Sequence, residues 1–145
     1  MSTTSGAVVF PSGRAASPDE PASLKNHDLR MSVLVIVNDQ PYGSERPYNA
    51  LRLATALSKR DGVDVRVFLL GDAVGCAVAG QQLAEGHYHL DRMVKGLLHR
   101  AQVGCCGTCL DARGLSEEQL VDGARRSTLE ELTDWTLWAD QVLTF

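Results

Sequence analysis

VLVIV at residues 33–37 is a continuous run of branched apolar residues, which is the pattern of a strand buried on both faces of a parallel sheet. VDVRVFLL at residues 63–70 predicts a second strand, and QVGC at residues 102–105 predicts a short third one. QVLTF at residues 141–145 is long enough for a final strand. These four segments define the sheet around which the rest of the sequence is arranged.

Helical patterns lie between these strands. Pro47 suits a helix that starts near Ser44 and runs to about Arg60, and apolar residues recur at helical spacing over residues 90–101. Caps predict three more helices: Asp72 before residues 73–79, Ser116 before residues 117–118, and Ser127 with Glu130 before a helix through Trp135. Because parallel strands need crossover helices, this alternation predicts a single α/β domain whose mostly parallel sheet is covered on both faces.

The composition excludes several classes of function. The chain has 145 residues and a formal net charge of −4, which suits one domain and offers no basic stripe for a phosphate backbone. We therefore expect neither nucleic acid nor a membrane as a partner, since no apolar run approaches the roughly 20 residues that span a bilayer. Residues 1–30 are rich in Ser, Ala, Gly and Pro and predict a disordered tail before a domain at residues 31–145.

Three of the four cysteines fall within CCGTC at residues 105–109. This crowding argues against a disulfide framework and fits a cytoplasmic protein with reduced thiols. Cys106 and Cys109 have the C-x-x-C spacing in which one thiol attacks a bound sulfur and the other resolves the product. A helix start and a cation such as Arg113 would lower the pKa of a thiol there. These three residues are the candidate catalytic residues for sulfur or redox chemistry.

Two other interpretations of the cysteines stay open at this point. Free cysteines often pack as small buried hydrophobes, which is the more frequent role for a residue such as Cys76. Cys105, Cys106 and Cys109 could also bind zinc together with Cys76 or a histidine. However, neighbouring side chains on a strand point to opposite faces, and no second C-x-x-C pair is present. We therefore expect no metal ion.

In parallel sheets, ligands collect beyond the carboxyl ends of the strands. The loop after the first strand, the turn after the second and the cysteine segment after the third are expected to meet there. The predicted pocket-lining residues are Asn38, Tyr42, Gly43, Asp72, Cys76 and Cys105. These loops contain neither G-x-G-x-x-G nor a Walker sequence, so no cofactor is expected. His87 and His89 fit a surface loop better than a general base or a ligand pair.

Several stretches together resemble one known family. They are NDQPYGSE at 38–45, LRLA at 51–54, GDAV at 71–74, CGTCLDARG at 106–114 and VLTF at 142–145. In combination they are similar to the DsrE/DsrF-like family, and most closely to its YchN-like branch, from about residue 31 to residue 145.

This resemblance implies a flavodoxin-like subunit that assembles into a homohexamer. Sulfur-relay members of the family pass persulfide sulfur between proteins, so a sulfur donor and a sulfur acceptor are the implied partners. In those members the receiving cysteine lies at a strand end, eight residues before the Gly of an Arg-Gly pair, and Cys106 has that position relative to Gly114. Cys109 matches the second cysteine of the YchN-like branch. Cys105 and Cys76 lie outside the pattern, and Cys105 could compete with Cys106 for sulfur.

Two functions therefore compete. The first is a sulfur-relay or thiol-redox protein that carries persulfide sulfur on Cys106. The second is a non-catalytic homo-oligomeric binding or assembly module with structural or zinc-binding cysteines. Trp135 and Trp138 at i and i+3 fit core or interface packing and make a lone monomer less expected. A hydrolase has no Ser-His-Asp or paired-carboxylate sequence behind it.

Overall fold

The computed structural model describes residues 30–145, which form a five-stranded sheet of order β4-β3-β2-β1-β5 with every neighbouring pair parallel. The strands are β1 (Met31–Val37), β2 (Val63–Leu69), β3 (Gln102–Cys106), β4 (Arg125–Ser127) and β5 (Gln141–Thr144). The helices are α1 (Arg46–Leu57), α2 (Leu90–Leu97), α3 (Gly107–Asp111) and α4 (Leu129–Trp138), with the 3₁₀ helices η2 (Gly71–Ala77) and η3 (Glu117–Gln119). The predicted tail lies, apart from Arg30, outside the described residues.

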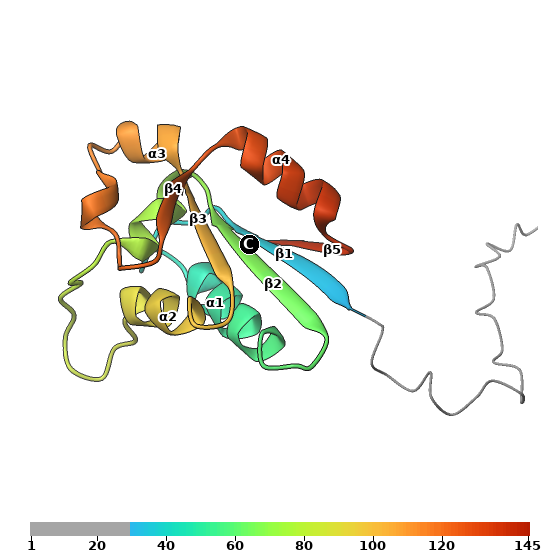
Figure 1. Cartoon of the computed structure of the whole chain (residues 1–145). Coiled ribbons are helices and arrows are strands. Elements are labelled where there is room, and N and C mark those ends of the chain that lie inside the picture. Colours follow the sequence, from blue (N-terminus) through green and yellow to red (C-terminus); the bar gives the residue numbers. More distant parts are fainter. Residues whose placement is uncertain (1–29) are drawn as a thin grey trace, which may run out of the picture.

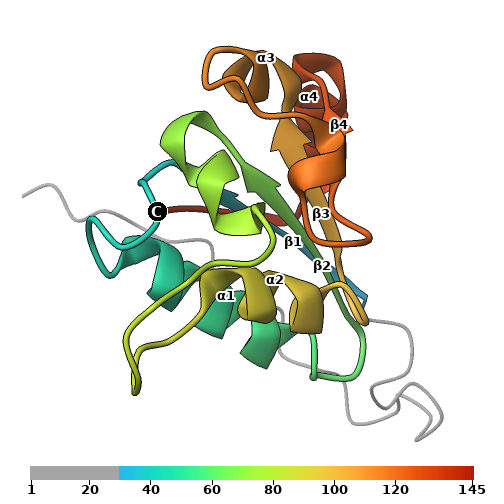
Figure 2. The ribbon, with the colours of Figure 1, turned by 90° about the vertical axis from the view of Figure 1, so that its left-hand side faces the viewer.

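Figures 1 and 2 show α1 and α2 on one face of the sheet and α4 on the other. The sequence of β1 is apolar without alternation because both faces of this strand are covered. Val33, Val35 and Val37 pack into the cluster beneath α1 and α2, whereas Leu34 and Ile36 pack with Trp135 of α4. Each such side chain, when fully buried, contributes about 1.5–3 kcal/mol. The prediction of an α/β domain with a parallel sheet covered on both faces is confirmed.

The C-terminal part contains an element that the sequence did not reveal. Strand β4 pairs with β3, Cys105 opposite Arg126 and Cys106 opposite Ser127. The prediction that Ser127 caps the last helix is wrong, because Ser127 lies in β4 and the hydroxyl of Thr128 accepts the cap hydrogen bond from the Glu131 amide. Buried Trp135 meets Phe68 edge-on with ring centroids 6.0 Å apart, as expected for a core tryptophan.

Two helix predictions also need correction. Asp72 does not cap the helix that follows β2, because that segment is the 3₁₀ helix η2 with Leu70 at its N-cap, and the Asp72 carboxylate instead accepts from Arg113. Helix α2 ends at Leu97 rather than at residue 101. The segment predicted as a cysteine loop is the end of β3 followed directly by α3.

Among the described residues, no helix is long and apolar enough to cross a membrane.

Candidate thiol site

The site lies at the carboxyl edge of the sheet, where β2 and β3 end beside each other. The Gly71 amide at the start of η2 donates to Cys109 Sγ at 3.2 Å. The carbonyl oxygen of Asn38, just after β1, lies 3.7 Å from the position that a Cβ on Gly71 would take. The structure therefore brings together the segments that follow the first three strands.

Cys106 is the last residue of β3 and the N-cap of α3. Its thiol is partly exposed and lies 3.3 Å from Thr108 Oγ1. Burial raises the pKa of Cys106. Hydrogen bonds from the side chains of Cys109 and Thr108, and from the backbone amides of the same two residues, lower the pKa by more than burial raises it. The net result is a pKa below the ordinary value of a cysteine, so Cys106 is the readier thiolate of the pair.

Cys109 has the opposite shift. Burial raises its pKa first, and the hydrogen bond that it gives to Cys106 raises it again. The Gly71 amide and the charge of Arg113 act in the other direction but do not reverse the sum. Cys109 is consequently a thiol that donates toward a neighbouring thiolate, as an attacking and resolving pair requires.

Arg113 lies beside the second thiol rather than the first. Its guanidinium donates to Asp72 Oδ1 at 3.0 and 2.5 Å and to the Cys109 carbonyl at 2.9 Å. Its charge lowers the pKa of Cys109, and within residues 30–145 it makes no hydrogen bond to Cys106. Arg113 was expected to lower the pKa of a site thiol, and it does so for Cys109. The effect is smaller than the rise caused by burial and by the hydrogen bond to Cys106.

The other two cysteines belong to the core. Cys105 and Cys76 are both 0% exposed and pack in the cluster beneath α1 and α2. Burial raises the pKa of each thiol to about 12, with the partner thiol adding to the shift of Cys76 and Glu117 adding to that of Cys105. Neither thiol lines an accessible site. Cys105 and Cys106 point to different sides, as neighbours on a strand must.

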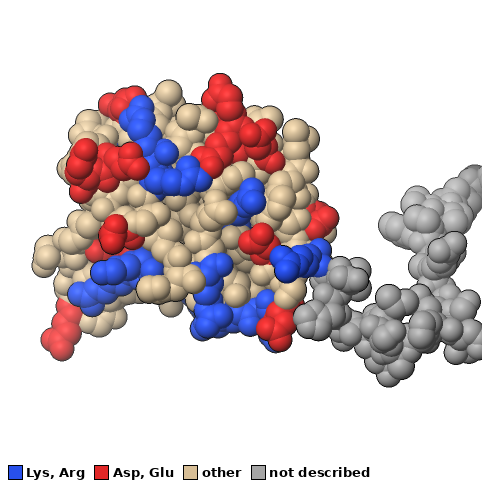
Figure 3. Space-filling view, in the orientation of Figure 1, with Lys and Arg blue, Asp and Glu red and all other residues tan. Residues whose placement is uncertain are grey.

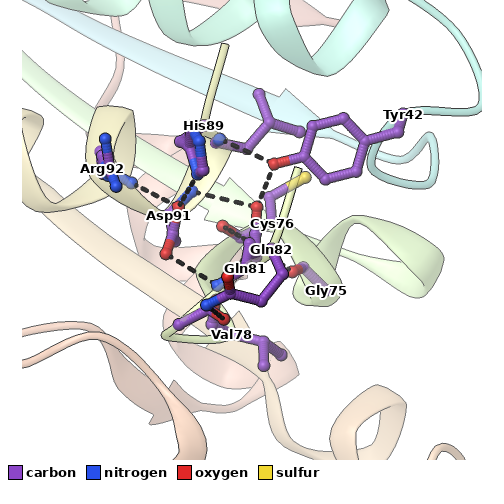
Figure 4. A network of polar contacts seen from close by, with 11 residues as sticks. Tyr42, Gly75, Cys76, Val78, Gln81, Gln82, His89, Asp91 and Arg92 are labelled. Carbon is purple, nitrogen blue, oxygen red and sulfur yellow. Dashed lines mark hydrogen bonds and ion pairs between the residues drawn. The ribbon is translucent and has the colours of Figure 1, made fainter. Parts of the chain in front are cut away.

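Tyr42 belongs to a second polar network rather than to the thiol site, and Figure 4 shows this network in part. Tyr42 has a positive φ of 64°, and its hydroxyl donates to Gln81 Oε1 and accepts from the Leu90 amide at 3.0 Å. The side chain of Gln40 covers Gly43, where a Cβ would collide with it. Asn38 lies beside Gly71, and its backbone amide donates to the Phe145 carbonyl at 2.8 Å.

One histidine, His89, makes its polar contact outside the Cys106–Cys109 pair. His89 belongs to the Tyr42 network, where its Nδ1 is 3.9 Å from Asp91 Oδ1. In the part of the chain that the structure describes, no group of three or more His, Cys, Asp or Glu side chains is placed to hold a metal ion. The arrangement therefore gives no support to the zinc interpretation.

Sequence reasoning missed four contributors to this site. Gly71 and Thr108 supply hydrogen bonds to the thiols, and Arg126 forms a two-pronged ion pair with Asp111 next to α3. The Arg126 guanidinium could not be placed without strand β4. Thr108 was within reach of sequence reasoning, because it lies between the two cysteines.

A parallel α/β sheet with the Cys106–Cys109 pair at its carboxyl edge defines a class of small thiol-bearing proteins. The chain belongs to the DsrE/DsrF-like family, whose family model matches residues 31–145. It is 44% identical over 115 residues to Protein YchN of Escherichia coli (strain K12), which covers 78% of this chain and 97% of YchN. It is also 40% identical over 116 residues to the uncharacterized protein MJ0989 of Methanocaldococcus jannaschii, which covers 79% of this chain and 100% of that protein.

Solved structures agree with this assignment. The crystal structure of the YchN protein from E. coli superposes with a TM-score of 0.73 at 43% identity, covering 79% of this chain and 99% of that one. A protein of unknown function from Methanobacterium thermoautotrophicum, MTH1491, superposes with a TM-score of 0.60 at 14% identity over 80% of this chain and 99% of that one, and shares the fold. The resemblance noted from the sequence motifs is thus confirmed.

Proposed function

We propose that this protein is a sulfur carrier that holds persulfide sulfur on Cys106, with Cys109 as the resolving thiol. The observation that carries the proposal is the asymmetry of the pair: Cys106 has a lowered pKa, Cys109 has a raised pKa, and the Cys109 thiol donates to Cys106. Membership of the DsrE/DsrF-like family supports the same chemistry.

Loading is a displacement at sulfur. The Cys106 thiolate attacks the outer sulfur of a donor persulfide, R–S–SH, the donor S–S bond breaks, and R–S⁻ leaves while Cys106–S–SH remains. Release takes one of two routes. An acceptor thiolate removes the outer sulfur and regenerates the Cys106 thiolate. Alternatively, Cys109 attacks the inner sulfur, the bond between the two persulfide sulfurs breaks, and the outer sulfur leaves with the Cys109 proton as H₂S, which gives a Cys106–Cys109 disulfide.

The surroundings suit this role. Cys106 is partly exposed at the end of β3, which allows a second thiol to approach it. Buried Cys105 has a pKa of about 12 and does not compete for sulfur in the folded chain. The compartment proposed is a reducing cytoplasm, where the thiols persist between turnovers.

Mass spectrometry tests the proposal. The reduced chain is incubated with a low-molecular-weight persulfide, and peptides are mapped after alkylation. We expect one added sulfur on Cys106 in the parent chain and a longer-lived persulfide in Cys109→Ser, because the internal release route is then closed. Absence of added sulfur on Cys106, with Cys106→Ser giving the same spectrum as the parent, would contradict the proposal.

Self-assembly is the second function that a specific observation favours. Leu129 and Leu137 of α4, about two helical turns apart, are 71% and 82% exposed, and an apolar surface left open along one helix suits an interface between copies of the chain. We propose that the chain forms a homohexamer, as its family likeness implies. Sedimentation velocity should give a hexamer for the parent chain and a smaller species for Leu137→Asp. A parent chain that sediments as a monomer would refute the assembly.

A further inference from the structure

The charges around α3 are arranged in close pairs. Figure 3 shows acidic and basic side chains in contact over this end of the molecule. One pair joins Arg126 of β4 to Asp111 of α3, with Nη1 and Nη2 donating to the two carboxylate oxygens at 2.7 and 2.6 Å. Such a fork fixes the plane and the direction of a guanidinium. The Arg126 charge is therefore held in one place although both side chains are exposed.

That place is next to the reactive thiol. A Cβ at Gly107, the residue after Cys106, would lie 2.9 Å from the Ser127 carbonyl oxygen, 2.9 Å from Arg126 Nε and 3.0 Å from Arg126 Cζ, so the backbone of β4 excludes a side chain there and the Arg126 guanidinium lies against Gly107. Arg126 thus crosses the first residue of α3. Its Nε is not used in the pair with Asp111, and among the described residues no hydrogen-bond acceptor is recorded for it.

The electrostatics of Arg126 connect it with the thiol. The pKa of Arg126 is raised above its usual value, mainly by the hydrogen bonds to Asp111 and further by the charges of Asp111, Glu117 and Cys106. Desolvation acts in the opposite direction but does not reverse the shift. Neighbouring Arg125 points to a different partner, the carboxylate of Glu131 on α4. Adjacent arginines of one strand therefore serve different sites.

We propose that Arg126, held in position by Asp111, is a positioning residue that stabilises the anionic sulfur on Cys106. The inference rests on the function proposed above. The outer sulfur of a persulfide lies about 2.05 Å beyond Sγ, so loading extends the anion away from Sγ into the space around it, and the unused Nε is a donor available to it. Because the pair with Asp111 uses only two of the five guanidinium donors, the anion need not displace Asp111.

The test compares three variants by the rate at which iodoacetamide modifies Cys106 in the full chain, read peptide by peptide. Arg126→Gln should slow the reaction at pH 7 about three- to tenfold, the scale of one nearby charge at a solvated site. Arg126→Lys should recover most of the rate, because it restores the charge. Arg125→Gln is the matched control, since it removes the same charge from the same strand and should leave the Cys106 rate unchanged.

Salt adds a readout that a merely structural role would not move. Raising the salt concentration from 0.05 to 0.5 M should slow Cys106 modification in the parent chain and in Arg126→Lys, but not in Arg126→Gln. An Arg126→Gln chain that melts like the parent and reacts at the parent rate would overturn the proposal. An Arg126→Lys chain as slow as Arg126→Gln would also overturn it, because charge would then not be the cause.

This assay uses no sulfur donor, so its failure is separate from failure of the sulfur-carrier proposal. If the parent chain takes up no persulfide sulfur, the carrier function falls while the alkylation rates still decide the role of Arg126. If Cys106 loads sulfur and Arg126→Gln alkylates at the parent rate, only the role of Arg126 falls.

Discussion

The four cysteines form two pairs that lie close in the fold and differ in almost every physical property. Cys76 and Cys105 are fully buried beneath α1 and α2, with pKa values raised to about 12. Cys106 and Cys109 lie at the carboxyl edge of the sheet, and their pKa values move apart. Cys105 and Cys106 are adjacent on β3, and because successive side chains of a strand point to opposite faces, one thiol lies in the core and the next one is reactive. Thiol chemistry here depends on placement rather than on cysteine content.

The largest effect should come from removing the reactive member of the exposed pair. In Cys106→Ser, total thiol modification by iodoacetamide at pH 7 should fall by about tenfold to a hundredfold, since thiolate fraction governs the rate and the remaining thiols have raised pKa values. Cys109→Ser is the matched control and should keep most of the fast reaction. Equal losses in the two variants would erase the proposed asymmetry.

The next effect concerns the buried pair and appears in stability. Cys105→Ser places a hydroxyl in an apolar core, and an unpaired buried hydroxyl costs about 1–3 kcal/mol of unfolding free energy. Cys106→Ser, at a partly exposed position, should stay within about 0.5 kcal/mol of the parent. Urea unfolding of both variants measures the difference. If Cys105→Ser is as stable as the parent, Cys105 is not the core residue described here.

The smallest effect lies inside the exposed pair. Cys109→Ala removes the hydrogen bond that lowers the pKa of Cys106, so Cys106 should react about two- to fivefold more slowly at pH 7, the loss of roughly 0.5–1 kcal/mol expected for one solvated hydrogen bond. Cys109→Ser keeps a hydroxyl donor and should lie between Cys109→Ala and the parent. A faster Cys106 in Cys109→Ala would show that Cys109 restrains the thiolate instead.

The sequence predicted the parts of this molecule that depend on local pattern. The apolar residues of β1 and β2 identify buried strands, and the spacing of Cys106 and Cys109 identifies the thiol pair. Strand β4 escaped because its sequence, Arg-Arg-Ser, is that of a polar edge strand with no apolar alternation. The last cap was misplaced by one residue because Ser127 and Thr128 are both good N-caps.

The remaining features depend on contacts between distant segments. Asp72 appeared to be a cap, and only the fold brings Arg113 from 41 residues away to pair with it. The Gly71 amide, which donates to Cys109 and moderates its raised pKa, lies 38 residues away along the chain. Spacing along the chain carries no information about such partners.

The central claim is the asymmetry of the Cys106–Cys109 pair, and a pH titration of all four thiols in one native sample tests it most directly. Brief isotope-coded alkylation between pH 5 and pH 10, read by mass spectrometry, follows the pH dependence of each cysteine's modification. As the pH is lowered, Cys109, with its raised pKa, should lose its thiolate while the pH is still above the ordinary cysteine value of about 8.5. Cys106, with its lowered pKa, should stay reactive below that value. Cys76 and Cys105 should remain unmodified until the chain unfolds. A Cys106 midpoint at or above that of Cys109 would contradict the account.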